Sequence, residues 1–216
     1  MNPMAGAGTP SVLHEELAAF YARHGFGDIV GARPLTVPVY TGCLLVPLPN
    51  IETRRRYLKY HDLHHLITAY SVGRIGEGEV SAWELGTGSV LASPMLAFMN
   101  LIALSTGLVL APGRMWRAFV RGTRSRNLYS KDTRTRIDSG HWQSVSRLRE
   151  SVLEVRPATA SWSPPRRVEF VCYCIVAMAI HAGIAIPALV ARLVTDITLG
   201  HSFFQAVKPK KRQDLF

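Results

Sequence analysis

Residues 60–70 read YHDLHHLITAY, and Gly76-Glu77 follow after a short segment. The stretch holds three histidines and an aspartate within five residues, and nothing else in the chain concentrates potential ligands in this way. Its leucines and isoleucine are apolar enough to anchor a helix. On that helix His61 and His65 are four residues apart, so both rings leave the same face one turn apart.

A divalent metal needs this arrangement from a helix: two converging imidazoles, a carboxylate beside them and one more ligand from elsewhere. Asp62 is the carboxylate that flanks the pair. The glycines of segment 73–76 interrupt the pattern, so we expect a turn that brings Glu77 back at the start of a helix opening at Glu77 or Glu79. The alternative is a solvated helix face that carries histidines by chance.

The spacing His61-Asp62-x-x-His65, eleven residues, Glu77 resembles the signature of the coenzyme Q biosynthesis protein four family. The specific part of the resemblance covers residues 57–90, and elsewhere it is general. Family members bind a divalent metal, usually described as zinc, through these four positions. The resemblance therefore implies metal ligands and catalytic residues at His61, Asp62, His65 and Glu77. His64 is not a motif position, so it either supports the ligands from behind or lies on the surface.

The same resemblance implies a reaction, which is oxidative decarboxylation at ring carbon 1 of a polyprenyl-hydroxybenzoate. The product belongs to the biosynthesis of ubiquinone or a similar lipid quinone, and a bound metal would act as a Lewis acid on the ring carboxylate or the adjacent phenolate. Zinc is the metal expected first, and iron and manganese stay open because zinc supplies no redox chemistry. The expected partners are the polyprenylated precursor and other quinone-biosynthesis proteins, with a homodimer as an open point.

Composition narrows the class of partner. The chain has 216 residues, of which 48% are hydrophobic, with a mean hydropathy of +0.11 and a net charge of +10. The length suits one domain with its own core. Basic charge combined with high hydrophobicity favours an anionic lipid surface over nucleic acid. Three cysteines form no pairing framework and indicate a reducing compartment. The N-terminus shows no secretory pattern.

The patterning along the chain predicts an all-α fold, a single-domain helical bundle with long apolar helices. We expect a flexible N-terminus over residues 1–8, one helical domain over 9–207 and a basic tail over 208–216. The prolines of segment 31–50 exclude a long helix there. They predict a Pro-rich connector, extended in parts but without partner strands, that packs along the helices. Residues 137–156 are expected to form a surface helix.

Two long segments, 89–112 and 170–191, carry no charged residue. Each is long enough to cross a bilayer core of ~30 Å, for which ~20 apolar residues suffice. Small and polar residues within 89–112 fit a buried helix or a lipid-binding wall equally well, and we expect a core helix that lines a groove for an isoprenoid tail rather than a span. In 170–191, His181 leaves a span and a core helix both open. We expect the two segments together to enclose the prenyl tail of the substrate.

Segment 114–126 alternates arginines with aromatic residues, as helices at membrane interfaces do. We therefore expect peripheral attachment to a membrane surface with anionic lipid, facing a reducing compartment. The expected location is the cytoplasmic face of a bacterial membrane, or the mitochondrial inner membrane in a eukaryote. Nucleic acid is the rival partner for such a segment, and the chain has no recognisable module for it.

Two other classes of function compete with the enzyme. The first is a lipid-binding scaffold that organises quinone-making enzymes, in which the metal holds the fold. The second is a membrane di-iron desaturase or hydroxylase, because His61-x-x-His64-His65 matches one histidine box, although that fold needs several. Ahead of the ligand cluster, Arg54, Arg55, Arg56 and Lys59 form a basic face that is either solvated or holds an anionic group of the substrate.

Overall fold

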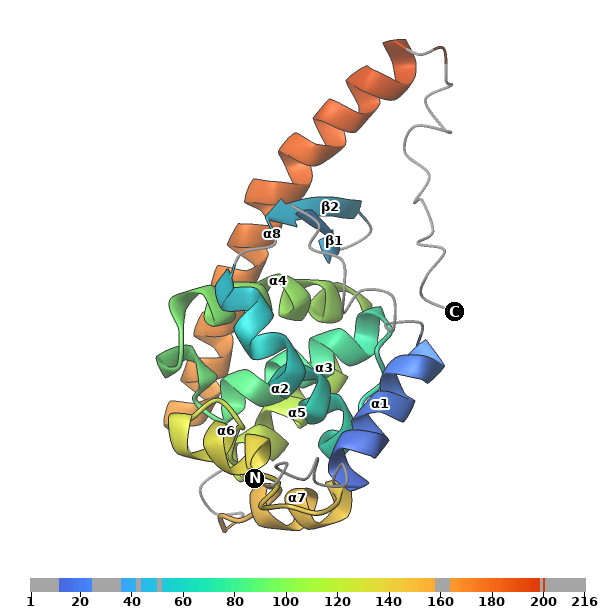
Figure 1. The fold of residues 1–216 in the computed structure, drawn as a ribbon. Coiled ribbons are helices and arrows are strands. Elements are labelled where there is room, and N and C mark those ends of the chain that lie inside the picture. The colour runs from blue at the N-terminus through green and yellow to red at the C-terminus, as the bar shows by residue number, and fades with distance from the viewer. Residues whose placement is uncertain are drawn as a thin grey trace, which may run out of the picture.

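A computed structural model describes residues 12–24, 36–41, 44–49, 52–157, 164–198 and 200. Within this part the fold is all-α, as predicted, with one added β-hairpin (Figure 1). The predicted flexible segment 1–8 and basic tail 208–216 lie outside the described residues. The helices are α1 (Val12–His24), α2 (Glu52–Thr68), α3 (Arg74–Gly86), α4 (Pro94–Leu110), α5 (Pro112–Thr123), α6 (Lys131–Asp138), α7 (Val145–Val152) and α8 (Pro164–Thr198), with a 3-10 turn η2 (Ser89–Leu91).

The Pro-rich connector forms a hairpin of β1 (Thr36–Thr41) and β2 (Leu44–Pro49), which pair antiparallel. The prediction that its extended segments have no partner strands is wrong, because they pair with each other. Pro38 lies opposite Pro47 in this register. Prolines are tolerated here because each strand of a two-stranded sheet has a free edge, where no N–H is needed. The hairpin contacts α4 and α8 (Figure 1).

Helix α3 is the centre of the molecule. Every residue from Gly78 to Gly86 is buried, and α4 and α5 both pack against this helix. The contact with α5 is close enough to require glycine on both sides. A Cβ at Gly86 would lie 2.3 Å from the carbonyl oxygen of Phe119, and one at Gly122 would lie 2.1 Å from that of Trp83. Backbone therefore packs on backbone along this interface.

Helix α3 also begins earlier than the sequence indicated. We predicted a start at Glu77 or Glu79, after a turn that included Gly76, but the helix begins at Arg74. Gly76 lies inside the first turn, where a Cβ would come within 1.9 Å of the Ser71 carbonyl oxygen. Glycine is needed at this position because the preceding loop packs closely against it, and not because the chain turns there. The Glu77 amide donates to the Gly73 carbonyl at 2.8 Å.

The first uncharged segment is split between three elements. It forms η2, then α4, and ends in the first turn of α5, because Pro94 and Pro112 each open a helix. One side of α4 is buried, with Ile102 and Leu104 fully inaccessible. The predicted core helix is thus confirmed for this segment.

The second uncharged segment lies in α8, a helix of 35 residues that extends beyond the body (Figure 1). Its inner side packs on α4, where Ala177 is fully buried. Its outer side is exposed and apolar: Val171 is 54% accessible, Ile175 64% and Ile186 61%. Within Pro164–Pro187 an 18-residue stretch has a mean hydropathy of 2.0 and is 6% buried, and by length and composition this helix could cross a membrane.

Helix α5 uses its apolar face inside the protein. Met115, Ala118 and Phe119 are buried, so this face is not available to a membrane. Arg114 binds Glu79 through two hydrogen bonds of 2.8 and 2.6 Å, and Arg121 donates to the Thr68 carbonyl at 2.9 Å. The apolar side of this helix thus packs inside the described fold, and the interfacial role of segment 114–126 stays a prediction.

Segment 137–156 is not one helix. Helix α6 ends at Asp138, Gly140 takes a positive φ of 72°, and α7 begins at Val145. The single surface helix predicted here is wrong, because glycine interrupts it. Helix α7 turns inward and contacts α1 and α2, with Leu148 fully buried.

Candidate metal centre

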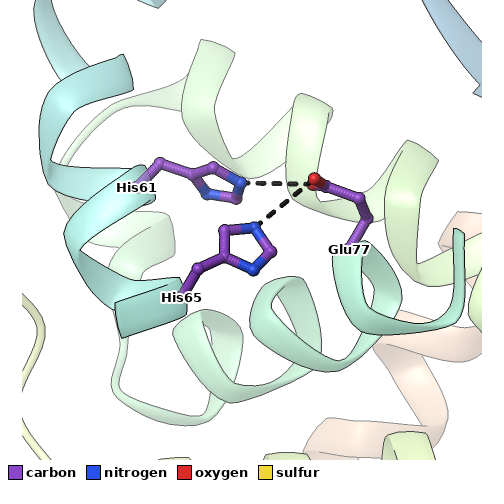
Figure 2. A group of neighbouring side chains, drawn as sticks. All are labelled: His61, His65 and Glu77. Carbon is purple, nitrogen blue, oxygen red and sulfur yellow. Dashed lines mark hydrogen bonds and ion pairs between the residues drawn. The ribbon is translucent and has the colours of Figure 1, made fainter. Parts of the chain in front are cut away.

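Three of the four predicted ligands come together. His61 and His65 project from α2 toward Glu77 in the first turn of α3 (Figure 2). His61 Nε2 lies 3.3 Å from Glu77 Oε2, and His65 Nε2 lies 3.4 Å from Glu77 Oε1. One ligand atom from each residue lies within 4.8 Å of the others. Spacing on one helix and a carboxylate from the next thus give a single cluster.

Both imidazoles are held through their other nitrogen. His65 Nδ1 donates to the Tyr70 carbonyl at 3.1 Å, and His61 Nδ1 donates to Glu84 Oε1 at 2.9 Å. Nε2 of each ring therefore faces Glu77. His65 Nε2 is buried and makes no hydrogen bond within the described part of the chain. A buried acceptor of this kind is costly unless something binds it, and a divalent cation between the rings and the carboxylate fits that need.

The turn after α2 sets the orientation of His65. Ala69 ends the helix in the left-handed region, with a φ of 62°, and its amide donates to the His65 carbonyl at 2.9 Å. The chain reverses there, and the Tyr70 carbonyl comes within reach of the His65 ring. Non-glycine residues take this conformation only where the surroundings enforce it.

Asp62 stands apart from the cluster. It is the next residue along the helix after His61, so its side chain points about 100° away. Tyr21 of α1 donates a hydrogen bond of 3.0 Å to its carboxylate. Burial raises the pKa of Asp62 above its ordinary value. The structure therefore gathers His61, His65 and Glu77, and Asp62 lies outside the group that it brings together.

His64 lies inside the protein rather than on its surface. It is fully buried, its Nδ1 donates to Glu84 Oε1 at 2.7 Å, and its Nε2 accepts from the Leu128 amide at 3.0 Å. Of the two placements that the sequence left open, the surface one is wrong. Burial lowers the pKa of His64, which agrees with a neutral ring whose Nε2 accepts a hydrogen bond.

Sequence reasoning missed Glu84. It lies seven residues after Glu77, two helical turns along the same side of α3, and this spacing is the signal that would have found it. Its side chain is 0% exposed. Burial works against its ionisation, but His61 and His64 outweigh burial and hold the pKa of Glu84 well below its usual range.

The cluster balances charge internally. Burial alone would lower the pKa of His61, yet the carboxylates of Glu84 and Glu77 together raise it well above its ordinary value. In the opposite sense, His65 and His61 overcome burial and hold the pKa of Glu77 well below its usual range. The Glu77 carboxylate thus faces the volume between the two rings, and the Glu84 carboxylate lies behind His61.

The basic face on α2 is only partly free. Lys59 makes a 2.8 Å ion pair with Asp138, whereas Arg56 is exposed. The side chains of Arg54 and Arg55 lie outside the described residues. Whether this face holds an anionic group of a substrate stays a prediction.

Two histidines and one carboxylate form a ligand set that catalytic zinc sites use, with a further position left for water or substrate. The same set suits iron(II). The Glu77 side chain is 39% exposed, so the cluster is reachable from solvent, while His65 is 1% exposed and stacks near Phe20 of α1. An accessible three-ligand set is typical of a catalytic centre, whereas structural zinc sites are closed by four ligands.

Comparisons of this chain with protein-family models, with curated proteins and with solved structures give no match.

Proposed function

We propose that this protein is a metal-dependent enzyme of lipid-quinone biosynthesis, acting at ring carbon 1 of a polyprenyl-hydroxybenzoate. One observation carries the proposal: the His61 and His65 rings are tied through Nδ1 and turn Nε2 toward Glu77. The resemblance of the His-Asp-x-x-His and Glu motif to the coenzyme Q biosynthesis protein four family supplies the substrate class.

In the proposed reaction the bond between ring carbon 1 and its carboxyl group breaks, carbon dioxide leaves, and a hydroxyl group takes its place. With water as the oxygen source, the ring gives up two electrons and one proton. A two-electron acceptor is therefore required, or dioxygen together with an external reductant. When bound by His61, His65 and Glu77, a divalent ion would supply Lewis-acid stabilisation of the anionic ring. Zinc is the first candidate, and the ligand set suits iron(II) as well.

The chain's own residues hold and orient the reacting groups. Phe20 of α1 packs beside His65 and keeps water from one side of the cluster. Glu77 is partly exposed, so an ion bound there could be reached by a ring carboxylate or phenolate. Arg56, exposed on α2, offers a cation for the approach of an anionic substrate.

The proposed location is a membrane, because a polyprenylated substrate resides there. The exposed apolar side of α8 supports this location, since a helix that is apolar on all sides is ordinarily buried in protein or in lipid. Contact through α8 is proposed in addition to the peripheral attachment expected from segment 114–126. Anionic lipid, other quinone-biosynthesis proteins and a second copy of the chain remain proposed partners.

Complementation tests the function directly. In a strain that lacks the carbon-1 step, the wild-type chain should restore quinone synthesis, and His65→Ala and Glu77→Ala should fail to do so. Elemental analysis and lipid mass spectrometry of the purified protein should find a divalent metal and a prenylated benzoate. Full quinone production by both variants would overturn the proposal.

A folding measurement on the ligand variants distinguishes the scaffold alternative from the enzyme. The core around α3 is built from apolar side chains and close backbone contacts, so the variants should keep their helical circular dichroism. If His65→Ala unfolds the protein, the metal holds the fold and the scaffold gains. The di-iron alternative needs a second ligand cluster. The described residues contain a single cluster, that of His61, His65 and Glu77.

A further inference from the structure

Glu84 has an unusual environment for a carboxylate. Its side chain is completely buried in the middle of α3. Three donors converge on Oε1: His61 Nδ1 at 2.9 Å, His64 Nδ1 at 2.7 Å and the Tyr129 hydroxyl at 2.7 Å. Asn100 donates to Oε2 at 2.8 Å. All four partners donate, so the group is an ionised acceptor, and each of its oxygens is occupied.

Three of these four partners do not compensate the charge of Glu84. Asn100 and Tyr129 are neutral donors. His64 is neutral as well, because its Nε2 accepts the Leu128 amide and cannot carry a proton. A buried charge persists when it is paired or when it serves a metal. The one partner that leads to the ligand cluster is His61, whose other nitrogen faces Glu77.

We infer that Glu84 is the positioning residue of the metal centre, holding His61 with Nε2 toward the ion and placing a buried negative charge behind it. A carboxylate on the far nitrogen of a ligating histidine fixes the tautomer and makes the ring a stronger ligand. Asn100, His64 and Tyr129 in turn fix the carboxylate. The inference rests on the proposed function, because it takes the cluster to be a metal site.

The two ligating histidines are therefore held by different means. His65 relies on a backbone carbonyl, whereas His61 relies on a charged side chain from another helix. Loss of Glu84 should affect His61 and leave the orientation of His65 intact. That difference makes the inference testable residue by residue.

The experiment compares the wild type with Glu84→Gln, which keeps the shape of the side chain but not its charge. Zinc affinity is measured by competition with a chromophoric chelator, and the tautomer of each histidine is read from nitrogen-15 spectra of labelled protein. Glu84→Gln should weaken zinc binding about 10- to 100-fold and should change the tautomer of His61 but not of His65. Glu79→Gln is the matched control, since this carboxylate of α3 is also buried but binds Arg114. It should keep the wild-type zinc affinity.

Tyr129→Phe guards against a folding defect in Glu84→Gln, because it removes one donor to the carboxylate and leaves the charge in place. It should weaken zinc binding by a smaller factor in the same direction. Unchanged affinity and unchanged His61 tautomer in Glu84→Gln, with zinc bound by the wild type, would overturn this inference alone. A wild type that binds no divalent ion would overturn the proposed function and this role together.

Discussion

Helices α3 and α8 distribute their side chains in opposite ways. Helix α3 carries three glutamates, two of them buried, and lies in the centre of the molecule. Helix α8 has no charged residue between positions 170 and 191, yet its outer side is exposed. Burial therefore does not follow hydrophobicity in either helix.

The difference shows that the buried carboxylates of α3 and the exposed apolar side chains of α8 each require a partner other than water. Each buried carboxylate of α3 has its own partners, with Arg114 on Glu79 and the histidines on Glu84. The exposed apolar side of α8 has no such protein partner among the described elements. A soluble helix ordinarily turns charged residues outward. We relate α3 to a bound cation and α8 to lipid, and the predictions below test that contrast.

The largest expected effect concerns the ligands that α2 offers to α3. Structural zinc sites gain about 10–16 kcal/mol from four ligands, so one ligand is worth roughly 3 kcal/mol and about a hundred-fold in affinity. His65→Ala should lose at least that much zinc affinity in a chelator competition. Asp62→Asn should stay within a few-fold of the wild type, because Asp62 faces Tyr21 rather than the cluster. Equal losses in both variants would return Asp62 to the ligand set.

Glycine-to-alanine substitutions compare the close packing of α3 with the open surface of α8. Gly86→Ala places a Cβ against the Phe119 backbone and should cost about 1–3 kcal/mol. Gly183→Ala in α8 meets no atom within 4 Å and should stabilise its helix by up to about 1 kcal/mol. Urea denaturation followed by circular dichroism measures both. The contrast fails if the two substitutions shift the midpoint in the same direction.

Lipid contact through α8 predicts that polar substitutions weaken membrane binding without unfolding the protein. Ile175→Asn and Ile186→Asn should each lower partitioning into anionic vesicles by up to about 2 kcal/mol, as measured by flotation. Val12→Asn on α1 changes a comparably exposed apolar residue and should have no effect. The unmodified protein should stay with membranes through an alkaline carbonate wash, and complete release would argue against insertion of α8.

The smallest effect is expected at the surface pair of Lys59 and Asp138. Although burial works against it, hydrogen bonds from Lys59 and Tyr60 hold the pKa of Asp138 below its usual value of 3.8. A lowered pKa in the folded state gives stability that is present above pH 3.8 and lost as the pH falls further. Because the side chains are 34% and 52% exposed, Asp138→Asn should cost less than about 1 kcal/mol at pH 7. Denaturation at a series of pH values below 3.8 should show the difference from the wild type shrinking as the pH falls.

The local patterns in the sequence predicted the helical fold and the encounter of His61, His65 and Glu77. Both depend on residue spacing along one or two helices. The spacing of Glu84 from Glu77 was a usable signal for its side of the helix, but its role arises from contacts with Asn100 and Tyr129, which are distant in sequence. Gly76 was predicted to lie in a turn. It packs instead against the backbone of Ser71, and a backbone contact leaves no pattern in the sequence. The hairpin was missed because proline is a poor strand former except at free edges, and the sequence does not say where the edges are.

The two ways of holding the ligands carry different consequences under sequence change. The carbonyl that fixes His65 belongs to the main chain at position 70, so most substitutions of that tyrosine preserve the acceptor. The carboxylate that fixes His61 is a side chain, so mutation can remove it or exchange it. One imidazole of the pair is thus mutationally robust, and the other is adjustable. Substitutions at position 84 should therefore change the candidate metal centre through the orientation of His61, while the orientation of His65 stays constant.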